Sequence, residues 1–248
     1  MTTKKNKTRF RNAVDASLDN AERLLGDAGW LALEDSAPTV YALCILAQEE
    51  FAKALILYLV DVGALPWNPE IRKMLRSHSC KHLFSLILDF LEAEFEEFWD
   101  RSVERLEEIN KGHSNRRVFP SHIADAINII RHEKANKYGS RNGWLETSEN
   151  PCDQVARKIG DGYIDRLKQN ALYVDIGRTG EVKSTPLRIK PDHAKIELEK
   201  TDRFRRILLR RDGTIIAPTG IDFDKVTAAF KLIFGIVSFE EFQENWRT

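Results

Sequence analysis

The chain has 248 residues, of which 42% are hydrophobic and 31% are charged, and this balance supports a folded core and argues against a disordered chain. The length fits one large domain or a domain with an appendage. Lys and Arg together number 38, as do Asp and Glu, so the zero net charge gives no global electrostatic reason to expect nucleic acid or an anionic membrane, although the sum does not show where the charges lie.

The first third of the chain predicts two long helices. Apolar residues recur at helical spacing from about Thr8 to Ala28, and we expect Gly26 and Gly29 to fray or end this amphipathic helix. A second helix runs from about Ser36 to Val62 and is apolar nearly all round. That pattern is typical of a helix at the centre of a bundle.

The next helices are marked by their capping signals. Asn68-Pro69-Glu70 combines a capping side chain, a proline and an acid, and the helical pattern continues to about Asn110 with a break near Ser77 to Ser79. A shorter helix is predicted from Ser121 to Asn136. Another runs from Asn150-Pro151 to about Asn170.

The sequence pattern changes in the last third of the chain, where short β-type runs alternate with helices. In order we expect strands at 172–176 and 182–189 that pair, a basic helix at 191–211, a short strand at 214–217, and helices at 223–234 and from Ser238. The predicted fold is therefore mainly α, with a small β-containing insertion near residues 172–218. We divide it into a helical bundle, 1–171, and a segment, 172–248, that packs on the bundle as part of one structural unit.

The cysteine spacing and the distribution of apolar residues indicate in which cellular compartment the protein is expected. Cys44, Cys80 and Cys152 are far apart and form no Cys-x-x-Cys, so we expect neither a disulfide framework nor a cysteine-built zinc site. The most apolar stretch contains charges at its middle, and the basic N-terminus is not followed by an apolar signal region. We expect a cytoplasmic protein without membrane association.

Polar residues interrupt the most apolar helix at Gln48-Glu49-Glu50-Phe51-Ala52-Lys53. One interpretation is an exposed stripe in which Glu49 and Lys53, four residues apart, form an ion pair. The alternative follows from the apolar residues on both sides, which imply burial, and buried carboxylates need partners. A polar cluster at the centre of a buried helix is a candidate functional site.

A second cluster, Arg76-Ser77-His78-Ser79-Cys80-Lys81-His82, lies at the start of the next helix. His78 and His82 share a helical face, but no third ligand has matching spacing, so we predict no metal and no cofactor. His78 and Lys81 also share a face, and a histidine beside a fixed cation suits phosphodiester chemistry. The other interpretation is a solvated basic helix end.

These elements together resemble the AbiV-type abortive infection family. The resemblance extends from about residue 12 to residue 195. It rests on Asn20-Ala21-x-x-Leu24-Leu25, on Ala42-x-x-Ile45-Leu46-Ala47-x-Glu49-Glu50-x-x-Lys53-Ala54, on His78-x-x-Lys81, and on Leu172-Tyr173-Val174-Asp175 with Gly180 and Pro186. It implies a HEPN-like helical bundle, commonly dimeric and often an RNase toxin in antiphage systems. Phe51-Ala52 stands where the family usually has Leu-Gly.

The resemblance also implies the site residues. Glu49, Glu50 and Lys53 on one helix and His78 and Lys81 on the next are the functional positions carried over from the family. HEPN RNases have an Arg-x4-6-His motif, and both Arg72-x5-His78 and Arg76-x5-His82 fit it.

Two hypotheses follow. In the first, the protein is a metal-independent RNase that acts as a homodimer in antiviral defence. His78 is then the acid/base, Arg76 and Lys81 hold phosphate, Glu50 and Lys53 orient them, and His82 is a further candidate. In the second, it is a non-catalytic helical dimer that binds a phage or host protein.

The zero net charge is a cancellation between blocks of opposite sign. Residues 89–108 are strongly acidic, whereas the N-terminus, 131–141 and 200–211 are basic. A chain segregated in this way can offer a basic surface to RNA. We therefore include Arg72, Arg203 and Arg206 as candidate RNA contacts.

Overall fold

The computed structural model describes residues 4–93, 100–104, 107–108, 111, 120–130, 153–208, 210–211, 214–215, 223–233 and 241. The longer helices are α1 (Lys4–Ala32), α2 (Ala37–Asp61), α4 (His78–Ala93), α9 (Pro191–Ile207) and α10 (Phe223–Ile233). The shorter helices are α3 (Pro69–Arg76), α6 (Ser121–Asn128), α7 (Gln154–Gly160), α8 (Tyr163–Leu172) and the 3-10 turn η3 (Pro186–Arg188). The prediction of a mainly α-helical fold is confirmed.

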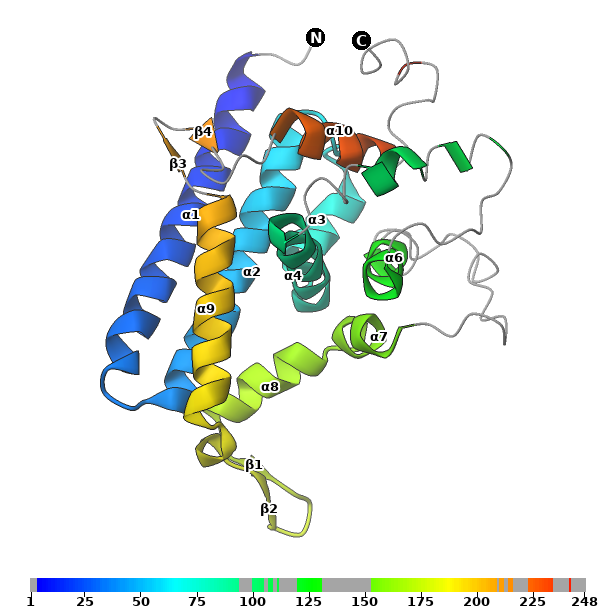
Figure 1. Ribbon diagram of the computed structural model, residues 1–248. Coiled ribbons are helices and arrows are strands. Elements are labelled where there is room, and N and C mark those ends of the chain that lie inside the picture. The colour runs from blue at the N-terminus through cyan, green and yellow to red at the C-terminus, as the bar shows by residue number, and fades with distance from the viewer. Residues whose placement is uncertain are drawn as a thin grey trace.

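Helix α2 is the centre of the bundle, as its all-round apolar pattern predicted. It packs against α1, α9, α4 and α8. In Figure 1, α1, α2 and α9 run alongside one another, with α4 beside them, and α8 runs from the lower end of α9 toward α7. A polar side chain on α2 therefore meets another helix in almost every direction.

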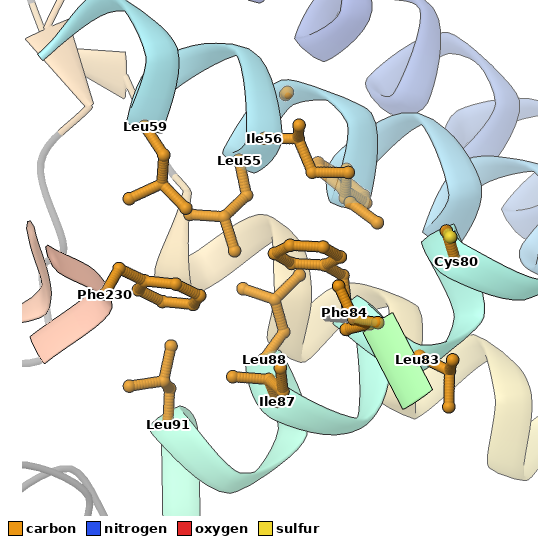
Figure 2. Close-up of a cluster of buried hydrophobic side chains, with 14 of the residues drawn as sticks. Leu55, Ile56, Leu59, Cys80, Leu83, Phe84, Ile87, Leu88, Leu91 and Phe230 are labelled. Atoms are coloured by element: carbon orange, nitrogen blue, oxygen red, sulfur yellow. The ribbon is translucent and has the colours of Figure 1, made fainter. Parts of the chain in front are cut away.

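The main core fixes α4 against α2. Leu55, Ile56 and Leu59 of α2 face Phe84 of α4, and Phe230 of α10 closes the cluster (Figure 2). The rings of Phe84 and Phe230 are stacked, with centroids 6.1 Å apart. Close packing of this kind leaves little freedom for α4 to rotate, so it sets the direction of the polar side chains in the first turn of that helix.

The end of α1 and the start of α4 test two predicted helix boundaries. The prediction that Gly26 and Gly29 end the first helix is wrong, because α1 continues to Ala32. Ala28, between the glycines, is fully buried, and packing against α2 outweighs the intrinsic helix penalty of about 1 kcal/mol per glycine. The break near Ser77 is confirmed: this residue is extended, with φ −85° and ψ 116°, so α4 begins at His78.

The single helix predicted from Asn150 to Asn170 is wrong. The chain forms α7 and α8, and Gly162 between them has a φ of 82°, a conformation that glycine adopts without a steric penalty. The change of direction lets α8 pack against α2. Residues 150–152, and the predicted continuation of the Ser121 helix beyond residue 130, lie outside the described residues.

Two small antiparallel sheets follow. Strands β1 (Asp175–Ile176) and β2 (Val182–Ser184) pair as predicted, with Asp175 opposite Ser184. The basic helix ends at Ile207 and not at Arg211, because Arg210 and Arg211 form β3 and pair with β4 (Thr214–Ile215). Backbone groups used in this ladder cannot continue the helix.

Helix α10 matches the helix predicted at 223–234. Most of the helix predicted from Ser238, and much of the stretch between Ala93 and Asn110, lie outside the described residues. Within the described ranges, no helix combines the length and the apolar character needed to cross a bilayer.

Candidate functional site

Three consecutive polar residues of α2 point toward three different surroundings. The amide of Gln48 donates to Thr201 Oγ1 of α9 at 3.0 Å, whereas Glu50 accepts from Lys53 one turn along α2 at 2.7 Å. Glu49 points toward α4 and α8. Successive helical residues are rotated by about 100°, so the three side chains cannot share one environment. The interpretation of a single exposed stripe is therefore wrong.

Four nitrogen-bearing side chains surround the carboxylate of Glu49. Its Oε2 atom lies 2.5 Å from His78 Nδ1 and 2.7 Å from Lys81 Nζ. Its Oε1 atom lies 2.7 Å from Lys168 Nζ and 3.3 Å from His82 Nε2. The last contact lacks the geometry of a hydrogen bond. One carboxylate of α2 thus joins the first turn of α4 to the middle of α8.

This cluster is closed except at one edge. The side chains of Glu49, Lys81, Lys168 and His82 are between 2% and 8% exposed, whereas His78 is 48% exposed. A buried carboxylate is costly unless it is paired and hydrogen-bonded, and here both oxygens are. His78 is the member of the cluster that solvent, or a ligand, reaches most readily.

The contacts decide the charge state of the buried members. Burial alone would raise the pKa of Glu49, but contacts with His82, Lys168 and Lys81 outweigh it and lower the pKa well below its usual range. Burial lowers the pKa of His82, against the opposing attraction of Glu49. At neutral pH, Glu49 is therefore ionised and His82 is neutral.

Lys168 connects a second carboxylate to the cluster. Its Nζ atom lies 2.8 Å from Asp165 Oδ1, three residues earlier on α8. Burial would lower the pKa of Lys168, but Asp165 and Glu49 outweigh that effect and raise it. The ammonium is therefore a permanent positive charge between two carboxylates.

The contact with Glu49 assigns the proton of neutral His78. An ionised carboxylate accepts hydrogen bonds only, so Nδ1 carries the hydrogen in the short contact with Glu49 Oε2. The Nε2 atom then has a free lone pair. This is the arrangement in which a carboxylate orients a histidine so that the other ring nitrogen can accept a proton.

His78 also lies at the N-terminal end of α4. Ser77 precedes the helix, and its hydroxyl accepts a hydrogen bond from the Cys80 backbone N–H at 3.3 Å. Backbone N–H groups at a helix N-terminus carry a partial positive charge that favours anions. The exposed edge of the cluster therefore combines a histidine nitrogen with a terminus that suits phosphate.

The structure brings together Glu49, His78, Lys81 and His82 among the predicted site residues. The predicted ion pair between Glu49 and Lys53 is wrong, because Lys53 pairs with Glu50. At position 49 the carboxylate points away from the surface on which Lys53 lies, toward the cations of α4 and α8.

The predicted arginines lie outside the cluster. Arg72 and Arg76 are exposed on α3, and within the described residues their guanidinium groups make no ion pair. On α9, Arg203 pairs with Asp89 at 2.9 Å and Arg206 pairs with Asp202 at 3.0 Å. Both α9 arginines line a groove between α1 and α9 whose lining contains no residue of the Glu49 cluster.

Sequence reasoning missed Lys168 and Asp165. Lys168 lies on the same face of α8 as the partly buried Ile164 and the buried Ala171, one turn away in each direction. A lysine on the apolar face of a short helix is a detectable pattern. The sequence does not show, however, that its partner is Glu49, 119 residues earlier.

Glu49, His78 and Asp165 also have the donor types of a metal site. Within the described residues, one ligand atom from each lies within 4.8 Å of the others. Carboxylate oxygens and an imidazole nitrogen suit zinc and similar ions. The ammonium of Lys168 already contacts these groups, so any metal would have to compete with it.

Comparison with known proteins gives one family match. A protein-family model of HEPN type, described as AbiV, matches residues 9–206. Neither a curated protein nor a solved structure matches the chain. The match spans α1 to α9 and so includes every residue of the Glu49 cluster.

Proposed function

Because the chain belongs to the AbiV family of HEPN proteins, we propose that it is an antiphage effector of abortive infection that cleaves RNA as a homodimer without a metal ion. One observation carries the proposal: Glu49 holds His78 by Nδ1 at the exposed edge of an otherwise buried cluster. That geometry leaves Nε2 available to accept and return a proton.

The chemistry would proceed at the N-terminal end of α4. His78 Nε2 would take a proton from the 2′-hydroxyl of RNA as that oxygen attacks the adjacent phosphorus, and a proton would return to the departing 5′-oxygen. The α4 N-terminus and the exposed Arg76, two residues before His78, would bind the charged phosphate. Lys81 and His82 are buried and would not reach the substrate, and the part of Lys81 would be to hold Glu49 in place.

Dimerisation is proposed from the exposure of His78. An active site with one open edge gains substrate contacts and excludes water when a second surface covers it. A second copy of the chain would supply that surface and place two His78 side chains near one RNA. The oligomeric state of the purified protein, measured by light scattering, tests this part separately.

We expect the purified protein to cleave single-stranded RNA in the presence of EDTA. A DNA strand of the same sequence should stay intact, because it lacks the attacking 2′-hydroxyl. The products can be resolved on a denaturing gel. A complete dependence on added metal, or equal cleavage of DNA, would contradict the proposed reaction.

A second candidate function is a non-catalytic helical dimer that binds a phage or host protein. The observation that favours it is the exposed apolar surface around the β1–β2 hairpin. Tyr173, Val174, Ile176 and Val182 are each more than half exposed, and patches of this kind often mark protein contacts. In this reading the purified protein leaves RNA intact, and substitutions in the hairpin, not His78→Ala, abolish phage protection.

A further inference from the structure

The ammonium of Lys168 lies at the common centre of three potential metal ligands. Its Nζ atom is 2.7 Å from Glu49 Oε1, 2.8 Å from Asp165 Oδ1 and 3.4 Å from His78 Nδ1. The same three residues form the group of metal-ligand type described above. A side chain of the protein thus occupies the place that a divalent cation would take between them.

We infer that Lys168 is the resident cation of this site: it positions Glu49 and Asp165 in place of a metal ion, and it positions His78 through Glu49. The charges agree with this role. Two carboxylates face one another across the site, and without a cation between them they would repel each other. Lys168 comes from α8, which packs against α2 and α4, so the fold delivers this charge from a third helix.

A lysine has a different consequence for His78 than a metal would have. A metal bound at Nδ1 would require the ring proton on Nε2, which would then be unable to accept a proton. The longer 3.4 Å approach of Lys168 leaves the Nδ1–H directed to Glu49 and leaves Nε2 free. This consequence rests on the proposed ribonuclease reaction, whereas the positioning role of Lys168 does not.

The test is whether removing the ammonium opens a metal site. Lys168→Ala leaves the three ligands and an empty space, and we expect it to bind one Co²⁺ per chain and gain the visible absorption of carboxylate- and imidazole-bound cobalt. The wild-type protein should show no such band. His78→Ala in the Lys168→Ala background should weaken or abolish the band.

Lys81→Ala is the matched control. Lys81 also contacts Glu49 at 2.7 Å and is also buried, but it has no contact with Asp165 within the described residues. Its removal lowers the positive charge equally while leaving Lys168 in place, so Lys81→Ala should not gain the cobalt band. Equal uptake by both variants would overturn the assignment.

Stability provides a second measurement if Lys168→Ala folds poorly. Addition of Co²⁺ should then raise its melting temperature, because an ion that binds only the folded chain stabilises it. If Lys168→Ala shows no cobalt absorption and no thermal shift with Co²⁺, the inference is overturned. Cobalt uptake does not depend on RNA cleavage, so failure of the ribonuclease proposal would leave this test intact.

Discussion

Replacing Glu49 with glutamine is expected to lower the free energy of unfolding by about 3–5 kcal/mol, the range observed when one partner of a buried ion pair is removed. The side chains of Lys81 and Lys168 stay buried in this variant, and each loses its contact with the charged carboxylate. Glutamine keeps the shape of the side chain, so the loss reports the charge and not a cavity. Urea denaturation of the folded variant measures it.

Glu50→Gln is the control on the neighbouring residue. Glu50 pairs with Lys53 at a partly buried position of α2 and has no contact with the cluster within the described residues. Pairs three residues apart on a helix contribute about 0.2–0.5 kcal/mol, so this variant should unfold almost as the wild type does. If Glu49→Gln and Glu50→Gln lower the free energy of unfolding by similar amounts, the Glu49 cluster does not stabilise the fold more than the Glu50–Lys53 pair does.

The same carboxylate should make stability sensitive to acid. The folded-state pKa of Glu49 is lowered, so the unfolded chain binds more protons in acid than the folded chain does. The contribution of Glu49 is therefore present above the unfolded value of about 4.3 and is lost as the pH falls toward the folded value. Below about pH 4.3, the stability of the wild type should fall more steeply than that of Glu49→Gln.

His78→Ala is expected to reduce the rate of RNA cleavage by about 10²–10⁴-fold, the usual contribution of general acid–base catalysis. The His78 side chain is half exposed, so the variant should remain folded with a circular dichroism spectrum like that of the wild type. Single-turnover cleavage in EDTA measures the rate without interference from product release.

His193→Ala is the matched control for this substitution, because His193 is an exposed histidine on α9 with no part in the cluster. It should cleave RNA at the wild-type rate. Cleavage by His78→Ala at that same rate would refute a catalytic role for His78 and favour the protein-binding alternative.

The helical framework could be predicted because its signals are local. Asn68 caps α3 by accepting from the Ile71 backbone N–H at 2.9 Å, and the all-round apolar pattern of α2 identifies the central helix. Gly162, by contrast, divides α7 from α8 within a stretch whose sequence pattern predicts one continuous helix. One glycine is compatible with a helix interior, so only tertiary structure decides between the two outcomes.

The candidate site could be predicted only in part. The sequence shows the two polar clusters of α2 and α4, and the apolar residues around Glu49 and Glu50 indicate that a carboxylate is buried. The choice of Glu49 over Glu50 as the central residue depends on the rotation of α2 relative to α4, which packing around Phe84 determines. Lys168 lies far away in sequence and approaches only because α8 packs against α2.

The most direct measurement of the central claim is the position of the proton on neutral His78. Nitrogen-15 NMR of the histidine-labelled protein distinguishes the two tautomers, and comparison with His78→Ala identifies the signal. We predict that neutral His78 carries its proton on Nδ1, bound to Glu49, with Nε2 unprotonated. A signal that places the proton on Nε2 would contradict the account, because that nitrogen could not then act as the base.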